Sequence, residues 1–167
     1  MPTRLRLAIW RRLKRIGAVL LHDSLWVLPA DGKTREAFEW LAEEIEEQGG
    51  TALIWGAQSV DSQQDQTIVS RFQTEADARY ATLAESVRKL QRVTARRGGS
   101  AGRLQQIRRR LLGLERALRL ERRRDYFRAS GRQAAEEVLR RALADIDRRL
   151  QPVADFRSGG KPYALGH

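Results

Sequence analysis

The sequence contains no cysteine and only two histidines, His22 and His167, among its 167 residues. The missing thiols exclude a disulfide-stabilised scaffold, a thiolate metal site and a cysteine nucleophile. Two histidines are too few for a multi-histidine metal site. No apolar run approaches the roughly 20 residues that cross a bilayer, and no secretory leader is recognisable. We therefore expect a soluble, cytoplasmic protein without a metal or other cofactor.

Lysine is scarce as well, and arginine supplies almost all of the positive charge. The chain has 28 arginines, 4 lysines and a net charge of +11. This charge is segregated, with +5 over residues 1–30, −7 over 31–66 and +9 over 96–128. Two origins are open: a general arginine bias of composition, and a polyanionic partner. Because a bias alone would scatter the arginines, the segregation favours a polyanion, whose phosphates suit guanidinium groups.

The first 57 residues alternate between helical and extended patterns. Apolar residues at helical spacing predict a helix over residues 4–16, which Gly17 ends. Short aliphatic runs at 18–21 and 24–28 predict a β-hairpin.

A second helix and a third strand complete this predicted unit. Apolar residues at helical spacing predict a helix over residues 34–48, with Thr34 as its N-cap. The apolar run 51–55 predicts a third strand. Residues 1–57 therefore predict an α+β unit of order α-β-β-α-β.

The chain from about residue 60 to 150 is predicted to be helical. A long amphipathic helix spans about 62–96, and a second helix from Leu104 carries leucines at coiled-coil spacing. A flexible linker at 98–102 separates them, and Ser130-Gly131 separates the second helix from a third. Complementary apolar seams predict an antiparallel three-helix bundle over residues 60–150, followed by an irregular tail at 151–167.

No pattern in the sequence assembles a catalytic or metal site. The run His22-Asp23-Ser24 has the residue types of a hydrolase triad, but consecutive residues cannot adopt that geometry, so we interpret it as the hairpin turn. The stretch 98–102 lacks the Lys-Ser/Thr of a phosphate-binding loop. Glu43 and Glu47 repeat along one helix face and indicate a solvated surface rather than a metal or base site. We predict no enzymatic activity.

Tryptophan and one acidic residue have structural interpretations. The tryptophans fall one in each of four elements of the first unit, which favours core packing over a base-stacking platform. They are Trp10, Trp26, Trp40 and Trp55. Asp125 lies on the leucine side of the second long helix, where a carboxylate caps or pairs with arginine. We interpret the run Arg124-Asp125-Tyr126-Phe127 as a structural corner.

Two basic helix faces are the main functional candidates. With its apolar residues turned inward, the first helix presents basic residues outward with no acid among them, and arginines recur every seven residues opposite the leucine seam of the second long helix. Such faces have the form needed to follow phosphates, although a solvated face without a partner is the alternative. The predicted nucleic-acid-binding residues are Arg4, Arg11, Lys14, Arg15, Arg109, Arg116, Arg119 and Arg123.

Several runs in this sequence resemble the N-terminal domain of ChrB, the regulatory protein of bacterial chromate-resistance operons. The resemblance covers roughly residues 4–150 and is carried by Ile9–Ala18, Trp26–Pro29, Phe38–Ile45, Gly49-Gly50 and Arg124–Phe127. The pattern of helix, glycine and hairpin is also similar to the central domain of PaaX-type repressors, which has a ferredoxin-like fold. The resemblance implies a partial ferredoxin-like unit over residues 1–57 and a regulatory function.

The sequence departs from that family in two ways. Family members have a strand before the Trp-Arg helix, whereas this sequence begins directly at the helix. Either the native start lies elsewhere, or the sheet has three strands and an exposed edge that invites pairing with a second copy. ChrB proteins also continue into a chromate-resistance domain, so the resemblance does not carry chromate sensing to this sequence.

We therefore predict a cytoplasmic, non-enzymatic regulatory module of a chromate-resistance system that binds DNA through its arginine-rich faces as a homodimer. The alternative is a protein-interaction module. It would dock a separate chromate-resistance domain protein or self-associate through the exposed sheet edge.

Overall fold

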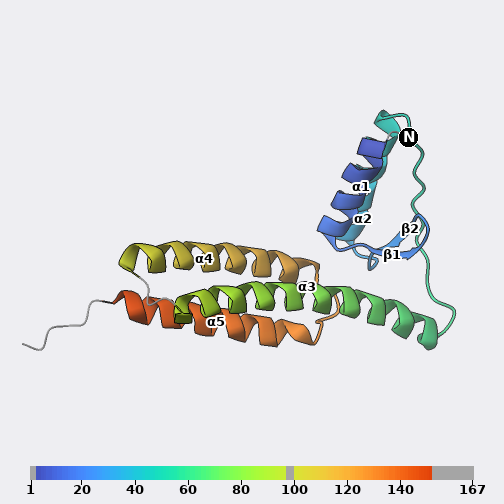
Figure 1. Cartoon of the computed structure of the whole chain (residues 1–167). Helices are drawn as coiled ribbons and strands as arrows, with labels where there is room; N and C mark the ends of the chain where they lie inside the picture. Colours follow the sequence, from blue (N-terminus) through green and yellow to red (C-terminus); the bar gives the residue numbers. More distant parts are fainter. Residues whose placement is uncertain (1–2, 97–99, 152–167) are drawn as a thin grey trace, which may run out of the picture.

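The computed structural model describes residues 3–96 and 100–151. Within these ranges the chain forms five helices and one two-stranded antiparallel sheet, which confirms the predicted α+β class (Figure 1). The elements are α1 (Thr3–Ile16), β1 (Val19–His22), β2 (Leu25–Val27), α2 (Gly32–Glu47), α3 (Ser62–Arg96), α4 (Ala101–Arg124) and α5 (Gly131–Leu150). Residues 98–99 of the predicted linker, and the predicted tail beyond Gln151, lie outside the described residues.

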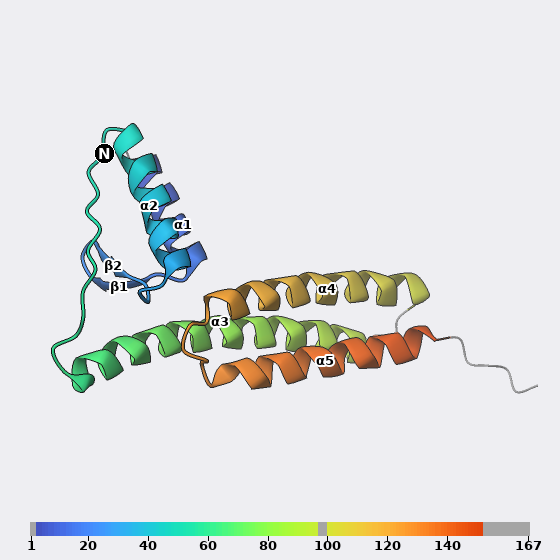
Figure 2. The same cartoon turned by 180° about the vertical axis from the view of Figure 1, so that it is seen from behind.

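The N-terminal elements share a small core between α1 and α2. Leu5, Ile9 and Leu13 of α1 are buried against Leu41 of α2, as the helical spacing of these residues predicts. The two helices lie side by side above the hairpin (Figures 1 and 2).

The hairpin forms as predicted. β1 and β2 pair antiparallel with Val19 opposite Val27 and Leu20 opposite Trp26, and the register shifts between Leu20 and His22. Asp23 has a φ of +44°, in the left-handed region that Asp tolerates in turns. The interpretation of His22-Asp23-Ser24 as the hairpin turn is therefore confirmed for Asp23 and Ser24, whereas His22 ends β1.

The predicted third strand at 51–55 is wrong, because residues 51–59 form neither helix nor strand. β-Prone side chains make a strand only when a neighbouring strand pairs with their backbone, and neither β1 nor β2 does so. The sheet of the described residues therefore has two strands, short of the predicted partial ferredoxin-like unit.

Core packing of the tryptophans is confirmed for one of the four. Trp26 is half-buried and packs against the N-terminal core. Trp10, Trp40 and Trp55 are 47%, 67% and 79% exposed, so the core prediction is wrong for them. Trp40 precedes the buried Leu41 in α2 and lies on a solvent-exposed side of that helix. Trp55 lies within residues 51–59, which pair with no strand.

The N-cap of α2 is Asp31 rather than the predicted Thr34. The Asp31 carboxylate accepts hydrogen bonds from the backbone N–H groups of Lys33 and Thr34 at 2.8 and 2.9 Å. The backbone N–H of Asp31 donates to the Thr34 hydroxyl in return, at 3.1 Å, which completes a capping box. A carboxylate at this position also interacts favourably with the helix dipole.

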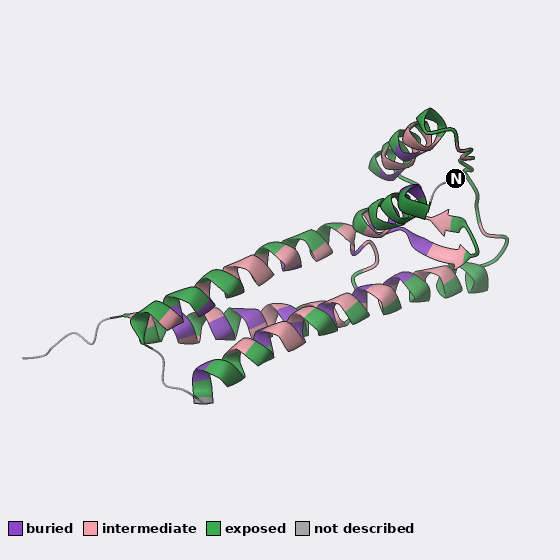
Figure 3. Cartoon of the chain, turned by 45° about the horizontal axis from the view of Figure 1, so that its top comes forward, coloured by how far each residue is buried: buried purple, intermediate pink, exposed green. Residues whose placement is uncertain are grey.

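The three C-terminal helices lie side by side, and the chain reverses direction between successive helices (Figure 1). Their buried residues run along the faces that meet (Figure 3). Tyr80 of α3, Leu111 of α4 and Leu139 of α5 belong to this shared core. Gly102, predicted in the linker, lies instead in the first turn of α4.

Candidate nucleic-acid interface

The end of α1 is fastened to the corner between α4 and α5. The guanidinium of Arg124 donates to the Lys14 carbonyl, and the hydroxyl of Tyr126 donates to the Ile16 carbonyl, both at 2.7 Å. These carbonyls belong to the last turn of α1, which the helix's own N–H groups leave without i+4 donors. The Lys14 carbonyl also accepts from the Gly17 N–H at 3.3 Å. The predicted corner at 124–127 thus also caps α1.

Gly17 allows this close approach. It has a φ of +83°, and a Cβ atom at its position would lie 2.7 Å from the Arg124 Cβ and 3.0 Å from the Arg124 carbonyl oxygen. Only glycine combines the left-handed backbone with the missing side chain that this contact requires.

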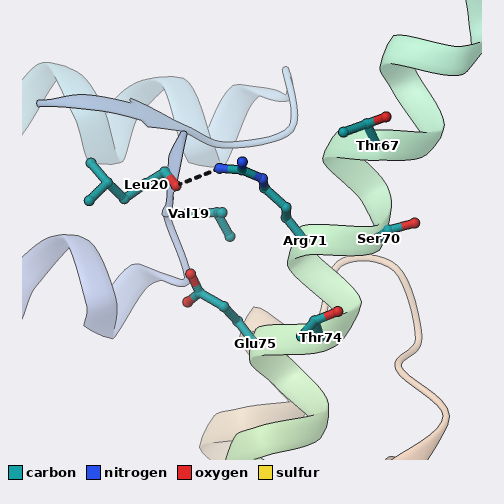
Figure 4. A pocket seen from close by; sticks show the side chains of 7 residues that line it. All are labelled: Val19, Leu20, Thr67, Ser70, Arg71, Thr74 and Glu75. Carbon is teal, nitrogen blue, oxygen red and sulfur yellow. Dashed lines mark hydrogen bonds between the residues drawn. The ribbon is translucent and has the colours of Figure 1, made fainter. Parts of the chain in front are cut away.

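A second set of contacts joins the hairpin to α3. One nitrogen of Arg71 donates to the carbonyl of Leu20 on β1 at 3.3 Å (Figure 4). The same nitrogen donates to the Leu21 carbonyl at 2.8 Å. Arg71 and Leu20 line an open hollow of about 500 Å³ between β1 and α3. The same face of α3 carries Glu75, which accepts a hydrogen bond from the Lys14 ammonium at 2.7 Å.

Lys14 therefore contributes to the junction, by which we mean the contacts that join α1 and the hairpin to the three C-terminal helices. Besides its ion pair with Glu75, its ammonium lies 5.3 Å from the centre of the Trp26 ring. Of the predicted phosphate-binding residues on α1, Arg4, Arg11 and Arg15 are exposed, and none of these three pairs with a described carboxylate. The cationic row on α1 consists of these three arginines.

The corresponding row on α4 is also exposed. Arg109, Arg116 and Arg123 point away from the core and form no ion pair with a described carboxylate. Arg119 is exposed but pairs with Glu115 at 3.2 Å. Arg108, on a neighbouring face of α4, instead forms an ion pair with Asp147 of α5 at 2.6 Å.

The two rows meet beside the junction. A shallow hollow of about 240 Å³ between α1, α2 and α4 is lined by both Arg15 and Arg123. Lys33, at the start of α2, and Arg124 line it as well. Asp31 lines the same hollow, and its hydrogen bonds from Thr34 and Lys33 lower the pKa of its carboxyl. We give the name cationic face to the two rows together with Lys33, which are Arg4, Arg11, Arg15, Lys33, Arg109, Arg116 and Arg123.

The sequence did not reveal three parts of this arrangement. Lys33 lies within residues 31–66, whose net charge is −7, so the net charge of that stretch does not indicate a cationic site. The junction roles of Arg124 and Lys14 depend on carbonyls and carboxylates far away in the chain. The left-handed Gly17 was the one local signal, and it indicated a helix end without indicating what packs there.

The acidic residues of α2 form no metal site. Glu43 and Glu47 are exposed, and the described residues contain no group of three or more potential metal ligands. The carboxylate of Glu44 instead pairs with Arg12 of α1. None of the helices in the described ranges is long and apolar enough to span a membrane.

Comparison with protein families gives one match. A family model described as "Protein ChrB, N-terminal" matches residues 6–155. The chain belongs to the ChrB N-terminal family. The match runs from within α1 to beyond the end of α5, and so covers the junction, the α4 row and, of the α1 row, Arg11 and Arg15. No curated protein and no solved structure matches this chain.

Proposed function

We propose that this member of the ChrB N-terminal family is a non-enzymatic regulatory module of a bacterial chromate-resistance system that binds duplex DNA through the cationic face. Family membership supports the regulatory role in chromate resistance. The observation that supports DNA as the partner is the meeting of the α1 and α4 rows beside Gly17, where Arg15 and Arg123 line one hollow.

The spacing of the arginines on α4 suits a phosphate backbone. Arg109, Arg116 and Arg123 are seven residues apart, which at 1.5 Å per residue places them about 10.5 Å apart along the helix. A row of guanidinium groups that form no ion pair within the protein can contact phosphates along one side of a duplex. These contacts supply affinity without reading sequence.

The first prediction concerns the salt dependence of DNA binding. The affinity for a duplex falls steeply between about 50 and 200 mM salt, because each phosphate contact releases condensed counterions. Replacing Arg109 and Arg116 together by glutamine lowers the slope of log affinity against log salt by about 2, since each contact contributes about 0.9. Fluorescence anisotropy with a labelled duplex measures both slopes.

The matched control removes two arginines from another face. Arg140 and Arg141 of α5 are exposed and both pair with Glu137, so Arg140→Gln with Arg141→Gln makes the same change in net charge. This variant keeps the wild-type slope. Equal losses in both double variants would show that binding follows net charge alone and would contradict the cationic face.

A second candidate function is docking of a separately encoded chromate-resistance domain protein. Exposed apolar side chains such as Trp40 and Trp55 favour it, because they can bury area against a partner. An intact complex at high salt, together with no DNA binding at low salt, would select this function over the first.

A further inference from the structure

The segment between α2 and α3 is apolar and has no partner in the chain. Residues 51–57, named here the apolar segment, run past the hairpin towards the start of α3 without forming helix or strand (Figures 1 and 2). No described residue makes a backbone hydrogen bond to them. Leu53 and Trp55 are 75% and 79% exposed, whereas Ala52 is half-buried and Ile54 is 44% exposed.

This exposure follows the period of a strand. Side chains two residues apart share one face of an extended chain, and here Leu53 and Trp55 share the outer face. The apolar segment contains no charge and no proline, although 32% of the whole chain is charged. An uncharged, β-prone segment with a free backbone is a template for pairing with another strand.

We propose that two copies of this chain associate by antiparallel pairing of their apolar segments about a two-fold axis at Ile54. A two-fold interface joins the same segment of both copies, so the segment must complement itself. With Ile54 on the axis, Leu53 of each copy lies opposite Trp55 of the other on one face. Cross-strand pairs of aromatic and aliphatic side chains stabilise a sheet, and no like charges oppose each other.

The area available sets the strength of this dimer. The exposed parts of the apolar segment offer roughly 400 Å² per copy, with Trp55 as the largest part. The total of about 800 Å² is the size of a weak, transient contact. The dimer is therefore concentration-dependent rather than obligate. The cationic face on α1 and α4 involves none of the residues 51–57 and stays free in it.

A cysteine on the axis tests the register. The chain has no cysteine, so Ile54→Cys introduces a single thiol. Directly opposed residues of an antiparallel pair have Cα atoms about 4.5–5.5 Å apart, within the range of a disulfide. Mild oxidation of Ile54→Cys therefore gives a cross-linked dimer on a non-reducing gel.

The matched control is Gln58→Cys, another exposed position just beyond the apolar segment. In this register two copies of residue 58 are separated by eight residues of strand, about 27 Å, and do not cross-link. Equal cross-linking of both variants, or none at position 54, overturns the proposed pairing.

Sedimentation equilibrium without DNA tests the association itself. The wild-type chain dimerises as its concentration rises, Trp55→Lys shifts the equilibrium at least tenfold towards monomer, and Trp40→Lys leaves it unchanged. Both tryptophans are exposed, so neither substitution disturbs a core. High salt weakens DNA binding but not this uncharged contact, so the two proposals fail separately. A wild-type chain that stays monomeric at millimolar concentration, or equal effects of the two variants, overturns the proposal.

Discussion

Single residues decide how the N-terminal elements are attached to the helices, and Gly17 is the most constrained of them. Its left-handed backbone lets the chain leave α1, and its missing side chain lets Arg124 and Tyr126 reach the last carbonyls of α1. Gly49 has a similar φ of +76° at the end of α2, but a Cβ there would meet nothing within 4 Å. A substitution at Gly49 therefore incurs backbone strain alone, whereas one at Gly17 incurs backbone strain and a steric clash.

We expect Gly17→Ala to destabilise the protein by about 3 kcal/mol, from the left-handed backbone together with a clash against Arg124. Gly49→Ala carries only the backbone penalty, about 1 kcal/mol. Urea denaturation followed by circular dichroism measures both free energies of unfolding. Equal losses would mean that the contact at Gly17 relaxes freely.

Asp31 makes the start of α2 sensitive to acid. Hydrogen bonds from Thr34 and Lys33 lower the pKa of its carboxyl in the folded state. Its contribution to stability is therefore complete above the unfolded pKa, about 3.9, and is lost as the pH falls through the lower folded pKa. Asp31→Asn keeps a capping oxygen but does not titrate. We expect thermal denaturation scans below pH 4 to show a smaller acid-dependent loss in the variant than in the wild type.

At the scale of elements, a buried hydrogen bond locks α3 to the corner after α4. The Tyr80 hydroxyl, fully buried on α3, donates to the Asp125 carboxylate at 3.1 Å, and the backbone N–H of Ala129 donates to its other oxygen at 2.9 Å. This confirms Asp125 as part of a structural corner. Asp125 caps the turn, whereas the neighbouring arginine, Arg124, pairs with Glu121.

Tyr80→Phe removes one donor from a buried carboxylate, and we expect a loss of about 2 kcal/mol in the free energy of unfolding. Tyr126→Phe removes a donor from a neutral carbonyl and serves as the comparison, with a loss of about 1 kcal/mol. A smaller loss for Tyr80→Phe than for Tyr126→Phe would contradict the role assigned to Asp125.

Burial and the neighbouring Asp125 also raise the pKa of Tyr80. The contribution of a group with a raised folded pKa is complete below its unfolded pKa, about 10, and is lost as the pH rises through the folded value. The wild type therefore loses stability in alkali, and Tyr80→Phe removes part of that loss. Denaturation midpoints between pH 8 and 11 measure it.

At the scale of the whole molecule, the cationic face depends on how the two parts of the chain are docked. The α1 row and the α4 row each belong to one part, and their ends meet where the corner at 124–127 holds the end of α1. The ends of two basic blocks that are far apart in the sequence, Arg15 and Arg123, thus line one hollow.

We expect Gly17→Ala to weaken DNA binding although it removes no charge, because displacing α1 separates Arg15 from Arg123. Gly49→Ala keeps the wild-type affinity. Both are measured by anisotropy at low salt and at a temperature where circular dichroism shows the variants folded. Unchanged affinity in Gly17→Ala would mean that the two rows bind independently.

Helices and strands were predicted correctly where the spacing of apolar residues and the residues that end an element gave the same bounds. The bounds of α3 and the hairpin were predicted because apolar spacing and turn residues act over a few residues. The third strand failed because a strand needs a neighbour, and the pattern at 51–55 carries no information about whether one exists. The core prediction failed for three of the four tryptophans for a related reason, since hydrophobicity does not state which face an element buries.

The sequence by itself determined the helices, the hairpin and the two rows of arginine, because each depends on residues a few positions apart. Only the tertiary structure decided that Lys14 belongs to the junction, that Lys33 joins the cationic face and that Leu53 and Trp55 are left exposed. These outcomes depend on carbonyls, carboxylates and strand neighbours that folding brings in from distant positions. No local pattern encodes their presence or absence.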